Sequence, residues 1–420
     1  MKAKKKIRIG LWLIAFPYGG GIYQFNLLVL KVLERFRKLN PLFTLHCFSP
    51  MKEWETYFRE NPCLCDSFAV VHSKRVGAQY LARRIAVSSR LPFLGLRLWI
   101  WRKINRYFPF EYRKVFQAKV DFMLYLAEDW QAAEIAIPSI SVIFDVMQRY
   151  TNAYNTRETK LRNFQQELIC KYSKTILADS RLGKKQIEDS YREVLKGEVI
   201  SLYYIPTFYI LAHNEAVDYS NRTTKFNLPS KYLFYPAQFW KYKNHDNLVR
   251  AVSTLDAKRI KVNVVLAGSR KDHYLKVLQL ISDLNVKANF HILGYVSNED
   301  IIALYKNAWA LVMPTFSGPT NLPIIEAIYL GCPVICSNLF EMPQQIGEAG
   351  LTCDPFNSND IAEKIEEVWN NAELRSQLAE KAKVEARKYS FEGYFTQWSD
   401  IIMEFCKRIR ISPQMTEDGN

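Results

Sequence analysis

The strongest constraint on the fold is an alternation of strand and helix patterns that begins at the N-terminus and begins again after residue 230. An apolar run from Ile7 to Ile14 precedes three glycines, and helical periodicity follows from Ile22 to Phe36. A strand, a glycine turn and a helix in this order are typical of the first unit of a Rossmann-like domain. With 420 residues, the chain is long enough for two such domains of about 200 residues each.

Further short apolar runs predict parallel strands, and helical patterns separate several of them. In the first half the predicted strands are Phe43 to Phe48, Phe122 to Leu126, Ser139 to Phe144 and Thr175 to Ala178, with helices at Thr159 to Ser173 and Arg181 to Tyr191. In the second half the strands are Tyr232 to Tyr235, Val262 to Ala267, Phe290 to Leu293, Ala310 to Met313 and Pro333 to Cys336, with helices at Asn247 to Leu255, His273 to Leu284, Asn298 to Asn307 and Ile324 to Leu330.

The alternation breaks between Tyr204 and Pro229, where polar residues and prolines accumulate. We therefore predict an N-terminal Rossmann-like domain at 1–210, a linker at 211–229 and a C-terminal Rossmann-like domain at 230–395. The aromatic helical pattern near the end predicts a helix at 396–412 that crosses between the domains. Residues 413–420 form the tail.

The N-terminal residues and the cysteines indicate in which cellular compartment the protein is located. The basic start and the apolar stretch after it resemble a signal peptide, but β-branched and aromatic residues before a glycine cluster favour a buried strand. The eight cysteines form no CxxC pair and have no histidines at zinc-ligand spacing. These features predict reduced thiols in the cytoplasm.

A net charge of +15 predicts an anionic partner. The segment 83–114 holds nine Arg or Lys and one acid, Glu111, interleaved with aromatic and aliphatic residues. Its apolar runs fall short of the ~20 residues needed to span a bilayer, but it could lie on an anionic membrane surface. An ordinary helix with one buried and one basic face is the alternative. No stacking motif accompanies the charge, so nucleic acid is not a predicted partner.

The segment Pro314 to Ile335 has the features of an anion site. A strand ends at Met313, a loop follows, and a helix begins near Ile324, so that helix amides point beyond the strand ends. Glu326 is expected in the first helical turn, where it could accept hydrogen bonds from a ribose. The alternative is that Glu326 merely complements the helix dipole.

This segment resembles the signature of the retaining group 1, or family 4, nucleotide-sugar glycosyltransferases of the GT-B fold. Members typically read E-G-F-G-L-P-x-x-E-A, whereas this chain reads GPTNLPIIEA from Gly318. Glu326 matches the second glutamate, and Gly318 stands where the first usually contacts the donor sugar. The resemblance implies two Rossmann-like domains facing an interdomain cleft, with Thr320, Asn321 and Leu322 lining the donor diphosphate.

Two further regions carry the resemblance. The family pattern G-R-x-x-x-x-K corresponds to Ala237 to Lys243, so Lys243 matches the lysine and Gln238 replaces the arginine. ISVIFDVMQRY resembles the family's strand ending in H-D-L-Q-H, where Asp145 matches and Phe144 replaces the histidine. Lys243 could instead be a solvated lysine before a helix, and Asp145 a strand-end cap.

The resemblance therefore implies a candidate site. Its predicted catalytic residues are Lys243, Glu326 and Asp145. Its predicted donor-binding residues are Gly19, Gly20, Gly21, Gln238, Lys243, Gly318, Thr320, Asn321, Leu322 and Glu326. The glycine cluster would permit close approach of a ligand to the backbone.

The implied reaction is transfer of a hexosyl group from a nucleoside diphosphate sugar to a hydroxyl of a glycan or lipid-linked glycan, with retention of configuration, as in polysaccharide or lipopolysaccharide assembly. No DxD-like pair is found in a suitable loop, so neither a metal nor another cofactor is expected. A catalytically inactive, glycosyltransferase-like scaffold is the alternative, because Gly318, Gln238 and Phe144 each lack a group that the family usually has.

Overall fold

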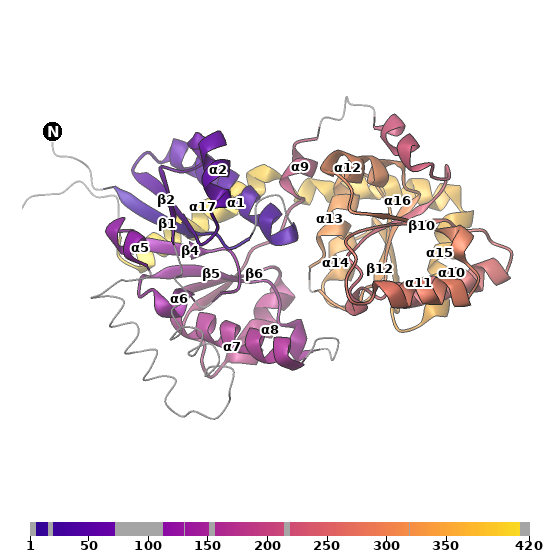
Figure 1. The fold of residues 1–420 in the computed structure, drawn as a ribbon, viewed down its shortest axis with the longest axis horizontal. Coiled ribbons are helices and arrows are strands. Elements are labelled where there is room, and N and C mark those ends of the chain that lie inside the picture. The colour runs from indigo at the N-terminus through magenta and orange to yellow at the C-terminus, as the bar shows by residue number, and fades with distance from the viewer. Residues whose placement is uncertain are drawn as a thin grey trace, which may run out of the picture. The chain divides into compact units, whose positions relative to one another are not determined.

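The computed structural model describes residues 6–15, 20–71, 112–129, 131–150, 156–213, 219–318 and 320–411. The chain divides into two compact units, which we describe separately (Figure 1). The N-terminal unit comprises Met1–Leu202 and Phe395–Asn420, and the C-terminal unit comprises Tyr203–Tyr394. The last described helix, α17 (Phe391–Arg408), begins in the C-terminal unit and continues in the N-terminal unit.

The N-terminal unit is built on a seven-stranded parallel sheet with the order β3-β2-β1-β4-β5-β6-β7. Its strands are β1 (Ile7–Trp12), β2 (Phe43–Ser49), β3 (Ser67–Val70), β4 (Phe122–Tyr125), β5 (Ser139–Ile143), β6 (Thr175–Ala178) and β7 (Glu198–Ser201). The strand order reverses between β1 and β4, which is the position where ligands bind in open α/β sheets.

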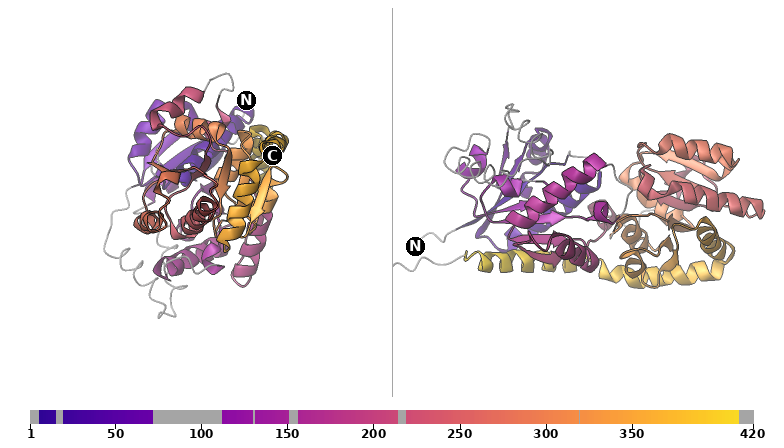
Figure 2. Two further views of the ribbon diagram at one scale, coloured as in Figure 1. Left: turned by 90° about the vertical axis from the view of Figure 1, so that its right-hand side faces the viewer. Right: turned by 90° about the horizontal axis from the view of Figure 1, so that it is seen from below.

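Helices pack on this sheet, as parallel strands require (Figure 2). They are α1 (Gly20–Leu39), α2 (Glu53–Glu60), α5 (Arg113–Gln117), α6 (Gln131–Glu134), α7 (Thr156–Tyr172) and α8 (Arg181–Tyr191), together with most of α17. The Phe405 ring of α17 lies 5.2 Å from that of Phe122 in β4, and the Arg35 guanidinium of α1 lies 4.4 Å from the centre of the Phe395 ring. These contacts explain why the C-terminal helix belongs to the unit that contains the N-terminus.

The C-terminal unit has a six-stranded parallel sheet with the order β10-β9-β8-β11-β12-β13. Its strands are β8 (Leu233–Pro236), β9 (Val264–Ala267), β10 (Phe290–Gly294), β11 (Ala310–Met313), β12 (Val334–Ser337) and β13 (Gly350–Cys353). Its helices are α9 (Phe208–Leu211), α10 (His245–Ala257), α11 (Tyr274–Asp283), α12 (Asn298–Asn307), α13 (Leu322–Tyr329), α14 (Met342–Ile346), α15 (Ser358–Asn370) and α16 (Ala372–Glu385). The order reverses between β8 and β11, as it does between β1 and β4 in the first sheet.

Two parallel sheets confirm the predicted α/β class with Rossmann-like halves. The N-terminal apolar run forms β1, a buried strand paired with β2 and β4, as predicted. All eight cysteines are free thiols. Within the described residues, none of the helices combines the length and apolarity needed to cross a membrane. The basic segment 83–114 lies outside the described residues up to position 111.

Candidate functional site

The two loops that carry the C-terminal motifs leave neighbouring strands at the point where the strand order reverses. The first loop follows β8 and runs through a short 3-10 helix, Lys241–Lys243, into α10. The second follows β11 and runs into α13. Because β8 and β11 are paired in parallel, both loops emerge at the carboxyl edge of the sheet. The structure therefore brings these motifs together where ligands bind in such folds.

Hydrogen bonds fasten the two loops to each other. The carbonyl of Tyr242 accepts from the Thr315 hydroxyl at 3.0 Å and from the Phe316 amide at 2.9 Å. Asn244, whose φ of 58° is left-handed, donates its side-chain amide to the carbonyls of Pro314 at 2.7 Å and Pro355 at 2.8 Å. The loops are thus held in one arrangement before any ligand arrives, which is a requirement for precise binding.

Lys243 and Asn321 meet between these loops. The Lys243 ammonium lies 3.4 Å from the side-chain oxygen of Asn321, and the Tyr235 hydroxyl donates to the main-chain carbonyl of Lys243 at 2.7 Å. Asn321 also donates its side-chain amide to the Gly318 carbonyl at 3.2 Å. Three of the predicted donor-binding residues, 243, 318 and 321, are therefore in one connected cluster.

One prediction for this loop needs correction. The Asn321 main-chain amide donates to the side-chain oxygen of Gln345 at 3.1 Å, so it is not directed at a ligand. The helix begins at Leu322, two residues before the predicted start, and the amide of Leu322 is one of those at a helix N-terminus that lack an intrahelical acceptor. Thr320 directly precedes this turn and is partly buried.

Gly318 has a backbone conformation that suits glycine alone. Its φ is 111°, and a Cβ atom there would lie 2.9 Å from the side chain of Asn321. The glutamate that the family usually has at this position would therefore be strained in this loop and would displace Asn321. The loop backbone at position 318 does not accommodate a glutamate, which agrees with the absence of that residue from this chain.

Substitution of Gly318 by alanine is expected to lower the free energy of unfolding by about 1–3 kcal/mol, because a side chain at this φ is strained. Urea denaturation measures the change. The matched control is Gly21→Ala in α1, where an added Cβ meets nothing within 4 Å. Equal stability of the two variants would contradict the assignment of strain to Gly318.

Glu326 lies behind the loop in a buried cluster of hydroxyl groups. The Thr207 hydroxyl donates to one carboxylate oxygen at 2.7 Å, and the Tyr305 hydroxyl donates to the other at 3.1 Å. Burial raises the pKa of Glu326, while hydrogen bonds from Thr207, Tyr305 and Tyr209 lower it in part. Because α13 begins at Leu322, Glu326 is in the second helical turn and not in the predicted first.

This arrangement changes the reading of Glu326. A carboxylate offers about four acceptor positions. The hydroxyls of Thr207 and Tyr305 bond to this one. Because Glu326 is buried, with 6% of its surface exposed, a ribose would have to displace protein groups to reach it. Glu326 fastens the segment around Thr207, early in the C-terminal unit, to α13.

Glu326→Ala is expected to lower the free energy of unfolding by about 1–3 kcal/mol, because buried hydroxyls of Thr207 and Tyr305 lose their acceptor. We also expect at least a tenfold loss of turnover, about 1.4 kcal/mol of barrier, because α13 supports the loop. Glu326→Gln keeps one acceptor oxygen, so it should lose less stability and less turnover than Glu326→Ala. Normal stability and turnover in the alanine variant would refute this role.

Gln238 is not part of the Lys243 cluster. It is exposed, and its side-chain oxygen accepts from the Trp240 indole at 2.9 Å. Lys241 is also exposed, on the same short 3-10 helix as Lys243. The structure thus gives Gln238 a local partner and no contact with Asn321 or Gly318.

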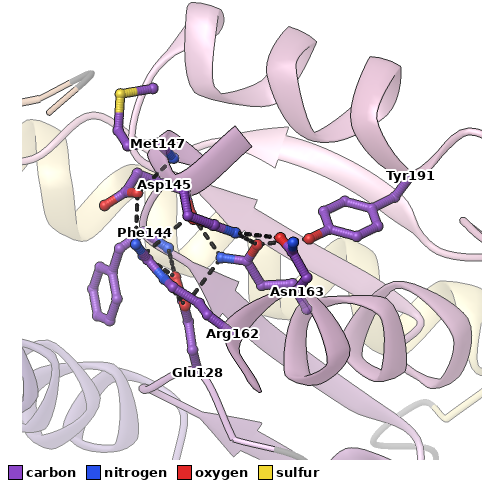
Figure 3. Close-up of polar contacts among 9 residues, drawn as sticks. Glu128, Phe144, Asp145, Met147, Arg162, Asn163 and Tyr191 are labelled. Carbon is purple, nitrogen blue, oxygen red and sulfur yellow. Dashed lines mark hydrogen bonds and ion pairs between the residues drawn. The ribbon is translucent and has the colours of Figure 1, made fainter. Parts of the chain in front are cut away.

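Asp145 lies in a polar cluster at the carboxyl edge of the N-terminal sheet (Figure 3). Its carboxylate accepts from the Met147 amide at 2.9 Å and pairs with Arg162 at 2.9 Å. Arg162 also donates to Glu128, with its Nε 2.9 Å from one carboxylate oxygen and its Nη2 3.1 Å from the other. Glu128 follows β4, Asp145 follows β5, and Arg162 comes from α7. The cluster joins two strand ends to one helix.

The cluster extends through amide side chains. Gln166 donates to Glu128 at 3.0 Å and to the Asp145 carbonyl at 2.7 Å. Its own oxygen accepts from Gln148 and from the Tyr191 hydroxyl, each at 2.7 Å. Burial raises the pKa of Tyr191, so this hydroxyl stays protonated and donates. Of these residues, sequence reasoning identified Asp145 alone.

The signal for Glu128 was available in the sequence, since it follows the predicted strand 122–126 at the edge where ligands bind. Arg162 and Gln166 share a face of α7, but the strand ends they contact could not be read from the sequence.

The remaining residues considered in the N-terminal unit are not part of the polar cluster around Asp145. The Phe144 ring, which replaces a histidine of the family pattern, packs edge-on against Phe25 of α1 with 5.5 Å between ring centres. Gly20 and Gly21 are the first residues of α1, and Gly19 lies outside the described residues. Across the described ranges, no group of three or more His, Cys, Asp or Glu residues is placed to hold a metal ion.

Comparison with known proteins relates part of the chain to a family. Residues 220–385 match the glycosyl transferases group 1 family. All of that segment lies in the C-terminal unit. The matched segment contains Lys243, Gly318 and Glu326.

Two curated relatives are bacterial mannosyltransferases. O-antigen chain mannosyltransferase B of Escherichia coli is 29% identical over 214 residues, which are 48% of this chain and 56% of that protein. Serotype-specific mannosyltransferase WbdA of Escherichia coli is 23% identical over 283 residues, which are 65% of this chain and 33% of that protein. The chain thus spans about half of the first relative and a third of the second.

Solved structures share the fold at low sequence identity. Sucrose-phosphate synthase from Thermosynechococcus elongatus has a TM-score of 0.67 at 15% identity, covering 96% of this chain and 100% of that one. HepE from Anabaena, solved in complex with UDP and glucose, has a TM-score of 0.68 at 13% identity, covering 95% and 100%. The fold is that of the GT-B glycosyltransferases.

Proposed function

We propose that this protein transfers a hexosyl group from a nucleoside diphosphate sugar to a hydroxyl of a glycan or lipid-linked glycan, with retention of anomeric configuration. The family match and the fold support the class of reaction. The observation that carries the proposal is the contact between Lys243 and Asn321, which joins two motif loops at the reversal point of the C-terminal sheet.

The geometry suits a diphosphate leaving group. As the bond from the anomeric carbon to phosphate oxygen breaks, positive charge develops on the sugar ring and negative charge on the diphosphate. Lys243 supplies a cation and the Leu322 amide a helix N-terminus, and both would stabilise that negative charge. The acceptor oxygen forms the new bond to the anomeric carbon, and its proton passes to the leaving diphosphate. A fixed cation takes over a task that metal ions perform in other enzymes, so we propose a metal-independent reaction.

The relatives suggest the sugar and the setting. Because two of them are named as mannosyltransferases, one of O-antigen chains, we propose mannose as the transferred sugar and a cell-surface polysaccharide as the product. We place the reaction in the cytoplasm, at the inner face of the membrane. Asp145, held by Arg162, is assigned to the acceptor side.

A transfer assay with purified full-length protein tests this function. Guanosine and uridine diphosphate sugars are offered with mannose-containing oligosaccharides, with and without EDTA, and both nucleoside diphosphate release and product anomer are measured. We expect turnover with a mannose donor, unchanged by EDTA, and a product of the donor's anomeric configuration. Nucleotide-sugar binding without any turnover across donors would favour the scaffold alternative and refute the enzyme.

A further inference from the structure

A basic hollow lies at the amino edge of the N-terminal sheet, opposite the edge that carries Asp145. One wall comes from residues at the starts of three neighbouring strands, and the other from the end of α17. The lining residues are Pro138, Lys174, Lys196, Glu198, Arg408, Ile409 and Arg410. Its volume is about 770 Å³, within the range of sites that hold small molecules.

The charges in this hollow are unbalanced. Four of its lining residues are cations, and Glu198 is its single acid. Glu198 is already ion-paired with Arg408, which also donates to the Thr175 hydroxyl at 3.1 Å. Within the part of the chain that the structure describes, no carboxylate lies at ion-pair distance from Lys174, Lys196 or Arg410. The hollow is therefore lined by three exposed cations that have no carboxylate partner among the described residues.

The backbone at the end of α17 contributes to this arrangement. Arg410 has a φ of 57°, and the Ile411 amide donates to the Cys406 carbonyl at 2.9 Å. Glycine is the usual residue at this left-handed position after a helix, because other side chains are strained there. Here the position holds an arginine, which is one of the residues that line the hollow.

We propose that this hollow binds a phosphate-bearing ligand. Lysine and arginine together are the side chains that recognise phosphate, Lys as a point charge and Arg through paired donors. Pro138 and Ile409 are the lining residues with apolar side chains, beside four cations. The lining has no aromatic residue on which a base could stack, which disfavours single-stranded nucleic acid. The site is separate from the proposed donor site and does not depend on it.

A structural explanation of the same residues makes a different prediction. Cations near the C-terminal ends of α7 and α17 stabilise helix dipoles. On that explanation, loss of the charges of Lys174 and Lys196 would lower thermal stability and leave anion binding unchanged.

Calorimetric titration with inorganic pyrophosphate tests the proposal. All proteins carry Lys243→Ala, so that the proposed donor site does not contribute. The test variant adds Lys174→Gln and Lys196→Gln, and the matched control adds Lys52→Gln and Lys185→Gln, two exposed lysines of the same unit that do not line the hollow. We expect Kd to rise at least about tenfold in the test variant and to stay within about twofold in the control.

A second experiment distinguishes a lipid headgroup from a soluble phosphate ester as the ligand. Co-sedimentation is measured with phosphatidylglycerol vesicles and with phosphatidylcholine vesicles. Parallel loss of binding to the anionic vesicles in the test variant indicates a lipid headgroup, and retained vesicle binding with lost pyrophosphate binding indicates a soluble phosphate ester. Equal pyrophosphate affinity in test and control variants, or no binding by the Lys243→Ala parent up to about 10 mM, would overturn the proposal.

Discussion

Replacement of Lys243 by alanine is expected to lower kcat/KM for sugar transfer at least about tenfold, equivalent to about 1.4 kcal/mol of transition-state stabilisation. The leaving diphosphate gains negative charge as the reaction proceeds, and a cation fixed beside it acts most strongly in the transition state. The fold around Lys243 should survive the change, because its main-chain carbonyl still accepts from Tyr235.

The control for this prediction is Lys241→Ala, which removes an exposed lysine from the same short 3-10 helix. Both variants are compared by transfer rate and by nucleoside diphosphate affinity. Lys243→Arg keeps the charge and should recover part of the rate. If Lys243→Ala and Lys241→Ala have the same kcat/KM, the assigned phosphate contact is wrong.

At each position where this chain departs from the family pattern, the local structure suits the residue that is present. Gly318 adopts a φ of 111°, Gln238 bonds to Trp240, and Phe144 packs on Phe25. Each replacement therefore has local contacts or a backbone suited to it. Restoring one family residue at a time would disturb these contacts, so we expect Gly318→Glu alone to lower stability without raising activity.

The central strands could be predicted from the sequence, and three of the four edge strands could not. The runs that form β4 and β11 are apolar without interruption, and those that form β1, β5 and β6 are mostly apolar and buried, because helices cover both faces of these strands. The missed strands are β3, β7 and β13, each at the edge of its sheet. Their residues are mostly half-exposed, so they lack the apolar run that marks a buried strand.

The candidate site could also be predicted only in part from the sequence. Local motifs identified Lys243 and the loop before α13, because strand ends and helix starts are encoded by nearby residues. The hydroxyl cluster around Glu326 was not predictable, since Thr207 is 119 residues away in the chain. Only tertiary packing shows that this carboxylate accepts hydrogen bonds from Thr207 and Tyr305. The same holds for Arg162, whose two carboxylate partners follow different strands.

Arg162→Met is expected to lower the free energy of unfolding by about 3 kcal/mol, because removal of one partner leaves Glu128 buried without its counter-charge. The Glu128 side chain is 10% exposed and that of Arg162 is 23% exposed, so solvent can replace little of the lost interaction. The Phe144 amide and Gln166 would still donate to Glu128, but neither carries a positive charge.

A double variant separates the charge from the rest of the cluster. Glu128→Gln combined with Arg162→Met removes both charges, so at least half of the lost stability should return. Lys160→Met, at an exposed position on the same helix, controls for the change in side chain. Urea denaturation of the wild-type protein and these three variants measures how much stability is lost and how much returns. If Arg162→Met costs no more than Lys160→Met, or if the double variant recovers nothing, the ion pair does not hold the two strand ends to α7, and Asp145 must be positioned by its remaining bond to Met147.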